Sequence, residues 1–188
     1  MIILTGFEKF SNYKINLSEI LVNQFEDRIE DNQIQKIILP VSWKRSISCY
    51  KNKISNLGEF PDLVVLLGIY SGQEIRLERY SWNVSIGVDE DNRFRMGPIK
   101  LLTKFRIKMS LNLINLIHMK NQGSKIVYSN YMGTFLCNYI YFNAMLIAAE
   151  KYPVIFIHIP YHGDLSELKI TVKHIILLAI KALKKKIS

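Results

Sequence analysis

Cysteine is scarce in this sequence: Cys49 and Cys137 are the two thiols in a chain of 188 residues. Two cysteines cannot build the disulfide framework of a small secreted domain, and neither belongs to a CxxC pair typical of zinc or redox sites. In a reducing compartment each is a free thiol, either a buried structural side chain or a reactive group. The residues around each thiol therefore decide between these two roles.

Long apolar runs and linkers are also missing. No apolar run approaches the roughly 18 residues that cross a bilayer, and the start, Met1–Gly6, lacks the basic region of a signal peptide. These absences disfavour a membrane or secreted protein and predict a cytoplasmic one. No repeat or low-complexity segment divides the chain, and 49% of its residues are hydrophobic, so residues 1–188 are expected to form a single folded domain.

Acidic residues are absent between Arg93 and Ala149, where every charged residue is Lys or Arg, and the net charge of the chain is +9. Such a balance permits a non-enzymatic protein to bind nucleic acid or another acidic partner. The simpler interpretation is a solvated basic face in a chain rich in Ile, Lys and Asn. Composition favours this second interpretation over nucleic-acid binding.

Alternating strand and helix patterns predict the fold class. Short continuous apolar runs are typical of strands buried on both faces, and the segments between them have helical apolar spacing. This order predicts an α/β fold, a single-domain three-layer α/β/α sandwich with a largely parallel central sheet. The predicted strands are Ile2–Thr5, Gln35–Pro40, Leu63–Leu67, Trp82–Val84, Lys125–Ser129 and Val154–Ile159. The predicted helices are Leu17–Phe25, Trp43–Asn56, Ile99–Met119, Phe135–Glu150 and Glu167–Lys185, and a loop or hairpin is expected over Ser85–Met96.

Cys137 follows a predicted strand and a Gly-Thr turn, in the first turn of a predicted helix with Thr134 as its expected N-cap. The helix dipole and the unpaired N–H groups at such a position favour a thiolate, and the same groups can donate to an oxyanion. A buried, inert thiol is the alternative interpretation of the same residues.

His158 ends a buried apolar run and is expected at the same sheet edge as Cys137, because ligands and functional groups gather at the carboxyl ends of strands. There it can serve as the general base for a thiol, although a core histidine with a structural hydrogen bond is the alternative. A third group should orient the imidazole, and Glu78 is the first candidate and Asp91 the second. Both can instead be surface carboxylates paired with arginine. The four histidines form no metal-ligand set, so no cofactor is expected.

Several separated segments resemble one family, the pyrrolidone-carboxyl peptidases, also called pyroglutamyl peptidases I. The segments that carry the likeness are Leu4–Phe10 (LTGFEKF), Leu39–Ser42 (LPVS), Leu77–Asn83 (LERYSWN), Gly133–Asn138 (GTFLCN) and Phe156–Tyr161 (FIHIPY). The resemblance implies a cysteine omega-peptidase that hydrolyses the amide bond after an N-terminal pyroglutamyl residue through a thioester. It also implies peptide substrates and a homo-oligomer, either a dimer or a tetramer.

The resemblance also implies roles for individual residues. It makes Cys137 the nucleophile, His158 the base and Glu78 the acid of a catalytic triad. The residues that it assigns to substrate binding are Phe7 and Phe10, as aromatic walls for the lactam, with Asn16 and Asp91.

Departures from the family pattern surround the expected pocket rather than the nucleophile. Lys9 and Leu17 replace family prolines, while Ile86 and Val88 replace an Asp and an Arg. The alternative interpretation is therefore that the chain is a divergent family member with altered acyl-amide specificity or no activity. The alternative from another class is the non-enzymatic basic protein described above.

Overall fold

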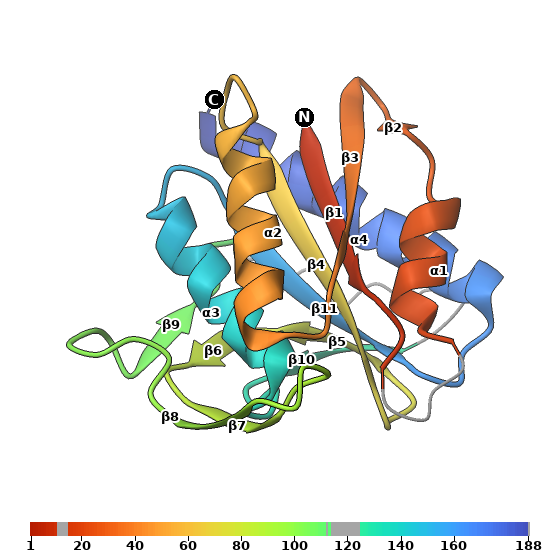
Figure 1. The fold of residues 1–188 in the computed structure, drawn as a ribbon. Coiled ribbons are helices and arrows are strands. Elements are labelled where there is room, and N and C mark those ends of the chain that lie inside the picture. Colours follow the sequence, from red (N-terminus) through yellow and green to blue (C-terminus); the bar gives the residue numbers. More distant parts are fainter. Residues whose placement is uncertain (11–14, 112, 114–124, 188) are drawn as a thin grey trace.

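A seven-stranded sheet forms the centre of the computed structural model, which describes residues 1–10, 15–111, 113 and 125–187 (Figure 1). The strand order is β10-β5-β11-β4-β1-β3-β2, and two further two-stranded sheets pair β6 with β9 and β7 with β8. In chain order the elements are β1 (Ile2–Phe7), α1 (Leu17–Gln24), β2 (Arg28–Ile29), β3 (Asn32–Leu39), α2 (Trp43–Ser55), β4 (Leu63–Tyr70), β5 (Ile75–Glu78), β6 (Tyr80–Trp82), β7 (Ser85–Val88), β8 (Phe94–Gly97), β9 (Arg106–Lys108), β10 (Ile126–Ser129), α3 (Leu136–Ala148), β11 (Val154–Pro160) and α4 (Leu165–Ile187).

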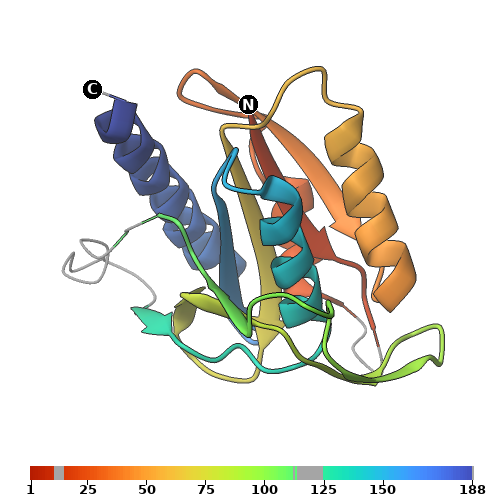
Figure 2. The same ribbon diagram turned by 90° about the vertical axis from the view of Figure 1, so that its left-hand side faces the viewer.

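The sheet is mixed but mostly parallel. Strands β3, β1, β4 and β11 run parallel to one another, as do β10 and β5, whereas β5 is antiparallel to β11. Helices α2 and α3 cover one face and α1 and α4 cover the other, as Figure 2 shows from the side. The predicted three-layer α/β fold with a largely parallel sheet is confirmed.

Strand β4 illustrates why the core forms in this way. Leu63, Val65 and Leu67 pack with α1 and α4, while Val64 and Leu66 pack with α2 and α3. Successive side chains of a strand point to opposite faces, so a strand covered by helices on both sides has to be apolar throughout. The continuous apolar run therefore predicted this central strand correctly.

The predicted helix Ile99–Met119 is wrong for its first part. Residues 99–105 form turns, residues 106–108 form β9, and residues 112 and 114–119 lie outside the described residues. Leu101, Leu102 and Phe105 are exposed instead of lining one buried helix face. Helical spacing stabilises a helix in a protein when the apolar face is covered, and here the segment pairs with β6 instead.

Other strands also differ from the sequence prediction. The predicted strand Trp82–Val84 is shifted to β6 and lies outside the main sheet, while β5 was not predicted. The segment Ser85–Met96, for which a loop or hairpin was expected, contains the hairpin of β7 and β8. Among the described helices, none is both long and apolar enough to cross a membrane.

Candidate active site

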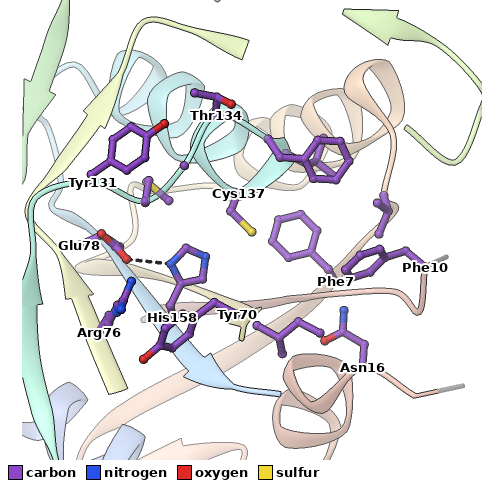
Figure 3. A pocket seen from close by; sticks show the side chains of 16 residues that line it. Phe7, Phe10, Asn16, Tyr70, Arg76, Glu78, Tyr131, Thr134, Cys137 and His158 are labelled. Carbon is purple, nitrogen blue, oxygen red and sulfur yellow. Dashed lines mark hydrogen bonds and ion pairs between the residues drawn. The ribbon is translucent and has the colours of Figure 1, made fainter. Parts of the chain in front are cut away.

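A cavity of about 360 Å³ opens at the carboxyl ends of the central strands (Figure 3). Its walls come from the end of β1 and the segment after it, the ends of β4 and β11, strand β5, and the segment that leads into α3. Six of the seven predicted site residues line it: Phe7, Phe10, Asn16, Glu78, Cys137 and His158. Residues far apart in the sequence therefore meet at the sheet edge that the fold rule for α/β proteins indicates.

Glu78 and His158 form a buried hydrogen-bonded pair on neighbouring strands. The Oε1 atom of Glu78 lies 2.8 Å from Nδ1 of His158, and the two residues are 0% and 5% exposed. A carboxylate oxygen only accepts, so Nδ1 carries the proton of this bond and Nε2 remains an acceptor. The rings of Phe156 and Tyr70 contact the imidazole, with centroid distances of 4.7 and 5.8 Å.

The direction of β5 explains how Glu78 reaches the imidazole. β5 runs antiparallel to β11 and places Arg76 directly opposite His158. Residues two apart on a strand share a face, so Glu78 extends on the same side as Arg76 and His158. A parallel β5 would need a long crossover after β4, whereas the short connection from Tyr70 to Ile75 permits this antiparallel return.

Cys137 is the second residue of α3, and its sulfur lies between the imidazole of His158 and the ring of Phe7, on the side of the imidazole away from Glu78 (Figure 3). The floor beneath the thiol is Gly68 of β4, the register partner of His158. A Cβ atom on Gly68 would lie 2.9 Å from Sγ of Cys137 and 2.9 Å from the ring of Phe156. A residue without a side chain is therefore needed here for the thiol to approach the histidine.

The N-cap prediction for this helix is wrong. The N-cap is Phe135, which makes no side-chain capping bond, and the carbonyl of Thr134 instead accepts from the N–H of Ile86. The helix start is held by Asn138, whose amide donates to the carbonyls of Trp82 and Val84, both at 2.8 Å. Its oxygen accepts from the N–H of Trp82 at 2.8 Å, so the first turn of α3 is fixed to the end of β6 and the segment after it.

The thiol does not have the low pKa that a helix start suggests. Burial, reinforced by the negative charge of Glu78, raises the pKa of Cys137 to about 12, although a backbone hydrogen bond acts in the opposite direction. Desolvation of the charged form thus outweighs the helix terminus. The resting group is a neutral thiol, and its reactivity depends on a base. Burial also raises the pKa of Cys49, which lies on α2 away from the cavity.

The aromatic wall depends on Asn16, which is the N-cap of α1 and almost fully buried. Its oxygen accepts from the N–H and the hydroxyl of Ser18, at 3.0 and 2.8 Å, and its amide donates to the carbonyl of Glu8 at 3.0 Å. These bonds join the start of α1 to the segment that carries Phe7 and Phe10. In Figure 3 both rings lie on the side of Cys137 opposite His158.

Asp91 does not line the cavity, so the structure gives no support to its predicted role in substrate binding. Its carboxylate accepts from Ser42 at 2.7 Å and pairs with Arg45 at 2.6 Å, at the start of α2. The Arg45 guanidinium and the Ser42 hydroxyl lower the pKa of Asp91 to about 2. The sequence showed a carboxylate but not its partners, because Ser42 and Arg45 are distant along the chain.

Tyr70 and Arg76 are among the residues that line the cavity but were not predicted as site residues from the sequence. The only available signal was that Arg76 and Glu78 are two apart, which places them on one face of any strand. This signal needed the strand itself, and β5 was missed. Among the described residues, no group of three His, Cys, Asp or Glu side chains is arranged to hold a metal ion.

The sequence as a whole matches the family model described as pyroglutamyl peptidase, over residues 1–184. The chain belongs to the pyroglutamyl peptidase family. This is a family of cysteine peptidases, and the predicted membership is confirmed. A pyrrolidone-carboxylate peptidase of Finegoldia magna is 31% identical over 173 residues, which cover 85% of this chain and 78% of that protein. The corresponding protein of Clostridium botulinum is 29% identical with the same coverage.

Solved structures of family members share the fold. The pyrrolidone carboxyl peptidase of Thermococcus litoralis superposes with a TM-score of 0.90 at 22% identity, covering 98% of this chain and 95% of that one. The pyroglutamyl peptidase I of Bacillus amyloliquefaciens gives a TM-score of 0.86 at 22% identity, covering 97% and 94%. The likeness in fold extends over nearly the whole chain.

Proposed function

We propose that this protein is a cysteine omega-peptidase that removes an N-terminal pyroglutamyl residue from peptides. The observation that carries the proposal is the buried Glu78–His158 pair, with the Cys137 sulfur facing the free side of the imidazole in an aromatic-walled cavity. The family to which the chain belongs and its pyrrolidone-carboxylate peptidase relatives support the same activity. We further propose that it acts in the cytoplasm.

The proposed reaction begins with proton transfer from the neutral Cys137 thiol to Nε2 of His158 as the sulfur attacks the scissile carbonyl. Backbone N–H groups in the first turn of α3 donate to the oxyanion. The C–N bond then breaks, and the imidazolium of His158 gives its proton to the leaving amine. His158 next takes a proton from the water that attacks the thioester, and it returns this proton to the departing Cys137 sulfur, so that pyroglutamate and the free thiol are released. Glu78 keeps the imidazole in the required tautomer throughout.

The cavity suits a flat neutral ring. A pyroglutamyl lactam has no ammonium group, and it is recognised by apolar walls and a few hydrogen bonds. Glu78 is the one carboxylate among the described lining residues, and it is already bound to His158. Phe7 and Phe10 are the proposed walls, and Asn16 supports them from below.

Hydrolysis of a fluorogenic pyroglutamyl amide tests the proposal. We expect turnover, and we expect Cys137→Ser to lower kcat/KM by at least about 10⁴-fold because the nucleophile is lost. Cys49→Ser is the matched control and should retain activity, since Cys49 lies on α2 outside the cavity. Turnover of other amino-acyl amides alone would favour the divergent member with altered specificity, and no turnover of any amide would exclude both enzyme functions.

Two further predictions about partners remain proposals. Binding of nucleic acid is disfavoured, because two basic side chains of the stretch between Arg93 and Ala149 lie over aromatic rings. These are Arg95 over Tyr139 and Arg106 over Tyr80. We also propose that the chain forms a homo-oligomer. The β7–β8 hairpin supports this, since it exposes an apolar face that a second copy would cover, made of Ile86, Val88, Phe94 and Met96. The mass in solution checks it.

A further inference from the structure

Arg76 is the cationic side chain in the wall of the cavity. It lies on β5 directly opposite His158 of β11 in the antiparallel register, so the two side chains share one face of the sheet. Its guanidinium carbon sits 4.2 Å from the centre of the Tyr70 ring. The hydroxyl of Tyr70 donates to the carbonyl of Glu74 at 2.5 Å, which fixes the ring that supports the cation.

The charge of Arg76 has no partner of opposite sign in the described part of the chain. No carboxylate there forms an ion pair with it, and the hydrogen bond of the nearby Glu78 is made with His158. A guanidinium that lies over a ring can still present its N–H edge to a ligand, and Arg76 lines the cavity. That edge matches the two oxygens of a carboxylate.

The position of Arg76 relative to the reaction indicates which part of a substrate it meets. In Figure 3, Phe7 and Phe10 lie on one side of Cys137, and His158, Tyr70 and Arg76 lie on the other. A general acid has to contact the nitrogen of the leaving amine, so the residue after the scissile bond lies on the His158 side. The register partner of His158 therefore faces the leaving group and not the lactam.

We propose that Arg76, held on Tyr70, forms a subsite for a carboxylate of the leaving group, so that the enzyme prefers pyroglutamyl peptides with an acidic group there. This inference rests on the proposed function. The carboxylate has two sources, the side chain of Asp or Glu in the second position, or the terminal carboxylate of a pyroglutamyl dipeptide. Both offer the same two oxygens to the guanidinium.

Three substrates separate these sources: pyroglutamyl-glutamine amide, pyroglutamyl-glutamate amide, and pyroglutamyl-glutamine with a free terminal carboxylate. We expect kcat/KM for at least one of the acidic substrates to exceed that of the neutral amide by about tenfold, as one charge-assisted hydrogen-bonded pair provides. Arg76→Gln should bring that ratio to about one. The acidic substrate whose advantage disappears identifies the source.

Arg79→Gln is the matched control, because Arg79 follows β5 and contacts the Tyr80 ring but does not line the cavity. It should keep the preference for acidic substrates. A purely electrostatic effect of Arg76 on His158 would change turnover of all three substrates alike and leave the ratio at its wild-type value. That result, or a wild-type enzyme that cleaves the neutral amide equally well, would overturn the subsite.

Binding provides a readout that does not depend on turnover. In the Cys137→Ser background, the dissociation constants of the same three peptides should show the same preference, and Arg76→Gln should remove it. If no pyroglutamyl substrate is cleaved but the acidic peptides bind more tightly through Arg76, the proposed reaction fails and the subsite stands. Equal binding of all three peptides overturns the subsite by itself.

Discussion

The two sides of the cavity are held by different forces. On one side, Glu78 and His158 lie on neighbouring strands inside the sheet, where the backbone ladder and burial fix them. On the other side, Phe7 ends β1 and Phe10 lies beyond it, and their segment is joined to α1 by the side chain of Asn16. The catalytic pair is therefore held in place by the sheet itself, whereas the aromatic wall for the substrate depends on individual side-chain hydrogen bonds.

The largest effect expected on this comparison is that of Glu78→Gln, which affects the sheet-held side. An amide keeps the shape but can place a donor against Nδ1 and favour the wrong tautomer, so we expect kcat to fall by about 10³-fold with KM little changed. The thermal unfolding midpoint should stay close to that of the wild type, because one oxygen of Glu78 is buried without a described partner. Glu150→Gln, at an exposed position after α3, is the control. A rise in KM with kcat unchanged would contradict the role of Glu78.

The second prediction tests the base through the pH dependence of alkylation. In a Cys49→Ala background, iodoacetamide should label Cys137 in the wild type near pH 7, and His158→Ala should slow this about 100-fold. The thiol with a pKa of about 12 is protonated at lower pH. The rate in His158→Ala should therefore rise about tenfold per pH unit from pH 7 to 11.

The wild-type chain provides the control for the alkylation experiment. Without the Cys49 substitution, Cys137 should be labelled before Cys49, whose pKa is also raised by burial and which has no described histidine beside it. Equal rates at the two thiols near pH 7 would show that His158 does not activate Cys137.

The smallest effect expected is that of Asn16→Ala, on the side held by side chains. Loss of the helix cap and of the bond to Glu8 should lower the free energy of unfolding by about 2 kcal/mol. KM should rise while kcat changes less, because the aromatic wall loosens but the triad does not move. Urea unfolding and steady-state kinetics measure both. Asn143→Ala is the control, because it removes a single side-chain hydrogen bond within α3. It should change the free energy of unfolding by less than about 0.5 kcal/mol. An equal loss of unfolding free energy in both variants would contradict the role of Asn16 in joining α1 to the segment that carries Phe7 and Phe10.

Much of the fold was predictable from the sequence because burial imposes a local pattern. The apolar run in β4 and the helical spacing of α4 each predicted the correct element, since both faces of the strand and one face of the helix are covered. The segment from Ile99 was predicted wrongly for the same reason. Its apolar spacing is helical, but Leu101, Leu102 and Phe105 are exposed, so in its first part the helical pattern does not correspond to a buried face.

The sequence by itself determined the α/β fold, the family, and the residue types of the site: a thiol at a helix start, a histidine at a strand end, and aromatic side chains at the end of β1 and just after it. Only the tertiary structure decided which carboxylate meets His158, because the antiparallel return of β5 brings Glu78 to the imidazole while Asp91 pairs with Arg45. It also decided the protonation of Cys137, since desolvation depends on atoms distant in the chain. Local apolar patterns reflect burial, whereas the pairing and protonation of charged groups depend on contacts between segments that are distant in the chain.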